Sequence, residues 1–167
     1  MKINGYKLQT AIKQAQEQRE FAEKRFHGGI FAFPGEKKPN PGATAVEIVK
    51  LEAKIARLQA AQASYNLQVQ IVTDAGSLSL HQAVKLVGGA ARIEKLWKEA
   101  LSQVSGETVD RYGGGRQRQA DAIIATPQVS IEEAEAAANA ASTYTRMLRE
   151  KIAAANATEI DLDVSLA

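Results

Sequence analysis

Hydrophobic residues recur along most of the chain at spacings of three and four, which is typical of one face of an α-helix. The first of these apolar stripes is interrupted by Arg19, whose aliphatic stem can still cover apolar surface. The pattern predicts helices over about 6–26, 44–65, 80–101 and 131–155.

The second and last helices carry the most regular seams. Their spacing is that of an antiparallel helix pair or a coiled coil, so we expect the seams to pack against helices of the same chain or of a second copy. The packing positions are Ile48, Leu51, Ile55, Leu58, Leu148 and Ile152.

Capping boxes predict where these helices begin. Thr44 is followed by Glu47, and Ser130 by Glu133, which is the spacing at which a hydroxyl and a carboxylate cap each other's backbone N–H groups. Ser79 with Gln82 predicts the start of the third helix in the same way.

A period of two replaces the helical period in short segments at about 66–72, 77–79 and 159–164. Alternation of apolar and polar residues indicates strands. The first of these segments and the tail at 159–164 are expected to pair as a small sheet.

Gly88 and Gly89 interrupt the third helix. Two glycines inside a helix cost roughly 2 kcal/mol relative to alanine, so some structural role is expected to compensate. The glycines allow a close approach between helices, mark a kink, or form a turn between two shorter helices, at about 79–87 and 90–103.

Glycines and prolines predict irregular loops at about 27–43 and 105–129. The first loop contains Ile30, Phe31 and Phe33. Because exposed aromatic side chains are unfavourable, at least one of the three is expected to pack back onto the helices.

Residues 1–167 are therefore expected to form a single, mainly α domain. We predict an antiparallel helical bundle or coiled-coil hairpin, with three long helices, one helix broken at Gly88–Gly89 and a small β element. Hydrophobic residues make up 45% of the chain but aromatic residues only 5%, and alanine supplies much of the rest. Narrow, alanine-rich seams favour partner helices from another subunit, so a homo-oligomer is expected.

Composition argues against several functional classes. There are no cysteines, which excludes disulfides, thiolate catalysis and cysteine-based metal sites. The N-terminus lacks the apolar core of a signal peptide, and no run is long enough to span a membrane, so a cytoplasmic protein is expected. His27 and His81 have no ligand-like neighbours, and Asp161 and Asp163 fit a solvated strand edge, so no metal or cofactor is predicted. Without a nucleophile or phosphate-loop motif, the chain is not expected to be an enzyme.

One loop motif could bind an anion or a nucleic acid. Three glycines let backbone N–H groups converge, arginines supply positive charge, and a tyrosine can stack on a base. The motif consists of Arg111, Tyr112, Gly113, Gly114, Gly115, Arg116 and Arg118. A turn at Gly88–Gly89 would add a recognition helix over about 90–100 that presents Arg92, Lys95 and Lys98. The balance of 21 basic and 19 acidic residues, a net charge of +2, argues against this alternative.

Two stretches resemble the septicolysin-like family of small bacterial proteins: "SYNLQVQIVTDAGSLSLHQAVKL" at 64–86 and "LREKIAAANATEIDLDV" at 148–164. In that family a helix ends in an Asn-containing strand and a short turn, and the last helix finishes with an Asn-x-Thr type of ending. The sequence departs from the family in its first loop, at Gly88–Gly89 and in the Gly-Arg loop. The family name implies a cytolysin, and the resemblance transfers no functional residue.

The sequence thus favours a non-catalytic structural or protein-interaction protein that assembles through its helix seams. A nucleic-acid-binding module built on 110–118 and 90–100 is the alternative. A cytolysin-like activity, implied by the family name alone, is the third hypothesis.

Overall fold

The computed structural model describes residues 1–74, 76–106 and 127–163 of the chain. The described residues are mainly helical and group into two compact units. One unit comprises residues 1–81 together with the C-terminal residues from 153, and the other comprises residues 82–152.

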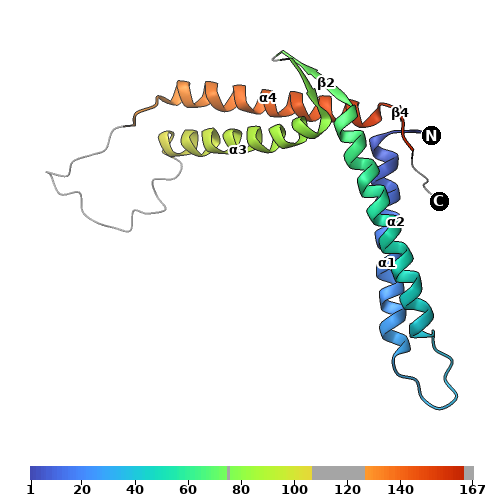
Figure 1. Ribbon diagram of the computed structural model, residues 1–167. Helices are drawn as coiled ribbons and strands as arrows, with labels where there is room; N and C mark the ends of the chain where they lie inside the picture. The colour runs from blue at the N-terminus through green and yellow to red at the C-terminus, as the bar shows by residue number, and fades with distance from the viewer. Residues whose placement is uncertain (75, 107–126, 164–167) are drawn as a thin grey trace, which may run out of the picture. The chain divides into compact units, whose positions relative to one another are not determined.

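The first unit is built on a long antiparallel hairpin of α1 (Gly5–Gly29) and α2 (Pro41–Gln68), as Figure 1 shows. Ile12 and Ala15 of α1 pack against Ile55 and Leu58 of α2 to form its core. Arg19, which interrupts the apolar stripe, instead forms ion pairs with Glu23 and Glu52 across the surface of the hairpin.

The start of α2 lies earlier than the sequence pattern predicts. Asn40 is the N-cap, and its side-chain oxygen accepts the backbone N–H of Ala43 at 3.1 Å. The predicted cap at Thr44 is wrong, because the Thr44 hydroxyl lies inside the helix and donates to the carbonyl of Asn40 at 2.9 Å. Proline at the first helical position costs nothing, since its missing N–H has no partner there, so Pro41 starts the helix.

The small β elements form two separate two-stranded sheets. β2 (Gln70–Thr73) and β3 (Gly76–Ser79) pair as an antiparallel hairpin, close to the predicted segments. β4 (Ile160–Asp161) pairs instead with β1 (Lys2–Ile3), so the expected pairing of the tail with residues 66–72 is wrong. Helix α2 continues through Gln68, so the strand predicted at 66–72 begins only at Gln70, and its partner is the neighbouring β3.

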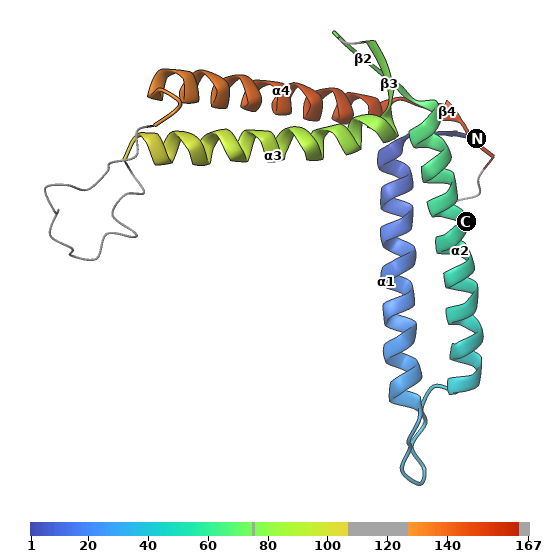
Figure 2. The same cartoon turned by 60° about the vertical axis from the view of Figure 1, so that its left-hand side comes forward.

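The second unit is a pair of helices, α3 (Leu80–Val104) and α4 (Ile131–Ala157), which run side by side in Figures 1 and 2. Helix α3 is continuous through Gly88 and Gly89, so the predicted break and the turn between two shorter helices are wrong. The expectation that the glycines allow a close approach to another helix of the same chain is also wrong. A Cβ atom at Gly88 would have no neighbour within 4 Å, and at Gly89 the nearest is the Arg92 guanidinium at 3.9 Å.

Helix α4 begins as predicted. Glu133 donates its backbone N–H to the Ser130 hydroxyl at 3.1 Å, and Ser130 donates its own N–H to the Glu133 carboxylate at 2.9 Å. This reciprocal pair confirms the capping box.

The loop between α1 and α2 does not fold back as expected. Phe31 is 83% exposed and Phe33 is 80% exposed, while Ile30 is about half exposed. The loop instead forms its own turn, in which Phe33 and Glu36 are hydrogen-bonded to each other, and its Pro39 carbonyl lies against Gly29.

Candidate interaction surfaces

The most unusual surface of the second unit is an apolar stripe on α3. Leu86, Gly89, Ile93 and Leu96 follow one another at spacings of three, four and three, so they share one flank of the helix. Ile93 is 51% exposed and Leu96 is 59% exposed. We call these four residues the α3 stripe.

Alanines make up most of the fully buried positions in the second unit, which are Ala83 and Ala90 of α3 and Ala134, Ala138, Thr145 and Leu148 of α4. Leu148 is completely buried, and Val87, Trp97 and Leu101 of α3 are half-buried, so large apolar side chains also contribute to the packing of this unit. Leu86, Ile93 and Leu96 are nevertheless exposed, although leucine and isoleucine usually supply the core.

A carboxylate lies in the seam between α3 and α4. Glu94 accepts hydrogen bonds from Lys98 Nζ at 2.6 Å and from the Ser142 hydroxyl at 3.1 Å, and its side chain is only 16% exposed. The hydrogen bond from Lys98 is the main reason that the pKa of Glu94 lies below the usual glutamate value. The Glu94 carboxylate therefore links α3 to α4, because it accepts one hydrogen bond from a side chain of each helix.

The side of α3 away from the stripe is charged. Glu94, Lys95, Lys98 and Glu99 line a groove there together with Arg149 of α4. Lys98 pairs with Glu94, and Lys95 pairs with Glu99 at 3.6 Å. Each of these lysines is paired with a glutamate one turn away, so two of the three basic side chains that line the groove already have an acidic partner.

The turn that the nucleic-acid hypothesis places before residue 90 is not present in α3. Residues 90–100 are the middle of the continuous helix α3 rather than a separate element after a turn. The Gly-Arg loop, from Arg111 to Arg118, lies outside the described residues.

The predicted packing positions lie inside the two helix pairs. Ile55, Leu58 and Leu148 are buried, and Ile48, Leu51 and Ile152 are half-buried. Ile55 and Leu58 contact α1 of the same chain, so these two positions are not free to form a contact between copies.

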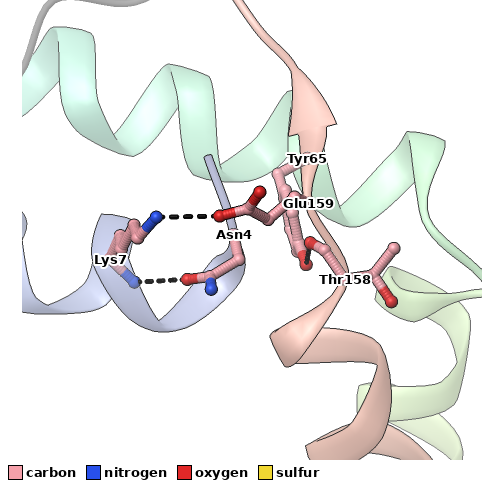
Figure 3. Close-up of polar contacts among 5 residues, drawn as sticks. All are labelled: Asn4, Lys7, Tyr65, Thr158 and Glu159. Atoms are coloured by element: carbon pink, nitrogen blue, oxygen red, sulfur yellow. Dashed lines mark hydrogen bonds and ion pairs between the residues drawn. The ribbon is translucent and has the colours of Figure 1, made fainter. Parts of the chain in front are cut away.

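A polar clasp joins the two ends of the chain within the first unit (Figure 3). Tyr65, which is fully buried, directs its hydroxyl to the carbonyls of Ala155 and Thr158, each at 2.7 Å. Lys7 forms an ion pair with Glu159 at 2.8 Å. Burial raises the pKa of the Tyr65 hydroxyl, which keeps it protonated as a donor.

The sequence gives little sign of this clasp. Tyr65 has the spacing of an ordinary seam residue, and β1 is only two residues long, too short to show a period. The lysine that pairs with the Glu159 carboxylate is 152 positions away in the sequence, a separation that no local pattern reports.

Metal-binding and membrane-spanning features are not present in the described part of the chain. Within residues 1–74, 76–106 and 127–163, no three His, Asp or Glu side chains gather in a way that could hold a metal ion. His27 and His81 are both exposed. None of the described helices has the length and apolar character needed to cross a bilayer.

Comparison with known proteins finds a protein of similar fold but gives no function. The chain matches no family model and no curated protein. It is similar to the crystal structure of a functionally unknown conserved protein from Corynebacterium diphtheriae, with a TM-score of 0.69 and 16% sequence identity. The match covers 96% of this chain and 100% of that one. At this identity the likeness shows a shared fold alone, and it does not bear on the resemblance to the septicolysin-like family.

Proposed function

We propose that this protein is a non-catalytic interaction protein whose second unit associates with the same unit of a second copy through the α3 stripe. The observation that carries the proposal is the exposure of large apolar side chains along one flank of α3. Leu86, Ile93 and Leu96 are exposed, although most of the fully buried positions in the second unit hold only alanine. Covering such a stripe removes apolar surface from water, which is the main driving force of association.

The stripe is complementary to itself, which favours a second copy over an unrelated partner. If two α3 helices pack antiparallel about a two-fold axis near residue 91, Leu86 of each copy meets Leu96 of the other, and Ile93 meets Gly89. The Ile93 side chain of one copy then packs into the space at Gly89 of the other copy, as in knobs-into-holes packing. Gly89 leaves the space for it, since among the described residues the nearest atom beyond its own helix backbone is the Arg92 guanidinium at 3.9 Å.

The expected association is weak. The stripe spans roughly 15 Å of helix from residue 86 to residue 96, at a rise of about 1.5 Å per residue. An interface of this length lies at the small end of specific protein–protein contacts. The dimer should therefore depend on concentration and exchange with monomer.

The experiment compares two charge insertions by sedimentation equilibrium. Ile93→Glu places a charge in the centre of the stripe and should abolish the dimer. Val84→Glu is the matched control, because Val84 is also exposed, at 45%, but lies off the stripe. Equal loss of the dimer in both variants, or no change in either, would contradict the proposal.

A further inference from the structure

The loop between α1 and α2, residues 30–40, displays apolar side chains that no part of the described chain covers. In Figure 1 this loop forms the end of the helical hairpin that is far from β1 and β4. Phe31 and Phe33 are the most exposed large hydrophobic side chains in the described residues. The loop takes no part in the α3 stripe, so it raises a separate question.

Hydrogen bonds and close backbone contacts within the loop keep the two phenylalanines exposed. Phe33 donates its N–H to the Glu36 carboxylate, and Glu36 donates its N–H back to the Phe33 carbonyl, both at 3.0 Å. Gly35 sits at the turn with a φ of 85°, a conformation that glycine adopts without strain. Gly29 lets the Pro39 carbonyl approach so closely that a Cβ atom would not fit between them. These contacts fix a turn that presents the rings outward.

The loop has a small positive charge. Within residues 30–40, Lys37 and Lys38 stand against Glu36, which is held by Lys38 at 3.3 Å. At the adjoining helix ends, Lys24 and Arg25 are accompanied by Glu23 and Glu47, and Arg25 pairs with Glu47. The net positive charge of the loop thus comes from Lys37, and a partner that covers the rings has to accept it.

We infer that this loop binds the surface of a membrane that contains anionic lipids. Phe31 and Phe33 enter the boundary between headgroups and acyl chains, while Lys37 and neighbouring basic groups contact lipid phosphates. Aromatic rings with lysines beside them suit this boundary, where apolar burial and attraction to anionic headgroups add together. The high exposure of both rings also favours a lipid surface, because a membrane can cover side chains that project from a loop.

The test measures binding of the full chain to sedimented vesicles. We expect binding to vesicles of phosphatidylcholine mixed with phosphatidylglycerol, and much less to phosphatidylcholine alone. Phe31→Ser with Phe33→Ser should lower the partition coefficient at least about tenfold, and Lys37→Glu should lower it as well. Leu67→Ser is the control, because Leu67 is 60% exposed near the other end of the same hairpin, and it should bind normally.

A fluorescent label then shows which part of the chain contacts the membrane. The chain has no cysteine, so Phe31→Cys and Leu67→Cys each carry a single environment-sensitive fluorophore. Only the label at position 31 should shift to the blue on anionic vesicles. Absence of binding to the anionic vesicles, equal binding to both vesicle types, or binding that survives the double serine variant overturns the inference. Loss of a protein partner in the serine variant, without vesicle binding by the native chain, overturns it in favour of a protein pocket.

Discussion

Gly88 and Gly89 offer a matched pair of substitutions, because they are neighbours in one helix but face different surroundings. Alanine is roughly 1 kcal/mol more favourable than glycine in a helix interior. Neither position meets an obstacle within its own chain, since a Cβ atom has no neighbour within 4 Å at Gly88 and only the Arg92 guanidinium at 3.9 Å at Gly89. Both Gly88→Ala and Gly89→Ala should therefore raise the free energy of unfolding of the monomer, by up to about 1 kcal/mol.

Self-association should separate the two variants. At Gly89 the new methyl group occupies the space that the Ile93 side chain of the second copy would fill. Overpacking of this kind costs about 1–3 kcal/mol, so the dimer Kd should rise at least about fivefold. Gly88 lies off the stripe, so Gly88→Ala should leave the Kd unchanged.

Two assays measure the two effects independently. Urea denaturation at low protein concentration gives monomer stability, and sedimentation equilibrium gives the dimer Kd. If both variants stabilise the monomer and shift the Kd equally, the knob-and-hole contact at Gly89 is refuted. If Gly89→Ala destabilises the monomer, the open surroundings of that position are refuted instead.

Two other predictions concern stability. Tyr65→Phe leaves the carbonyls of Ala155 and Thr158 without their donor and should lower the free energy of unfolding by about 1–3 kcal/mol, measured by chemical denaturation; an unchanged value would show that water replaces the hydroxyl. The depressed pKa of Glu94 means that its stabilising effect is present above the ordinary glutamate pKa and is lost as pH falls through the lower folded-state value. Thermal unfolding should therefore lose less stability on acidification in Glu94→Gln than in the native chain, whereas Glu99→Gln, at an exposed ion pair, should behave like the native chain.

The sequence pattern was sufficient for the helices because their period is sustained over many turns. Ser130 and Glu133 form the predicted capping box, and Ile55 and Leu58 occupy the predicted core. These features depend on residues that are close in the sequence or repeat regularly. Local patterns report such features directly.

The errors share a different cause, which is that tertiary context overrides local preference. Gly88 and Gly89 have low helix propensity, but the helix around them is long enough to continue through both. Pro41 looked like a helix breaker and instead starts a helix.

Two other features could not be found from the hydrophobic pattern. The pairing of β1 with β4 joins residues about 160 positions apart, which no periodicity encodes. The exposure of Phe31 and Phe33 was missed because their hydrophobicity predicted burial, whereas the turn closed by Glu36 holds them outward.

The mass of the native chain in solution, measured by sedimentation equilibrium over a range of concentrations, tests the central claim most directly. The measurement should be repeated after nuclease treatment and at high salt. The account predicts a reversible rise from the monomer mass of 18.0 kDa toward twice that value, unaffected by nuclease. A chain that stays monomeric at every concentration, or whose larger mass disappears with nuclease, would contradict it.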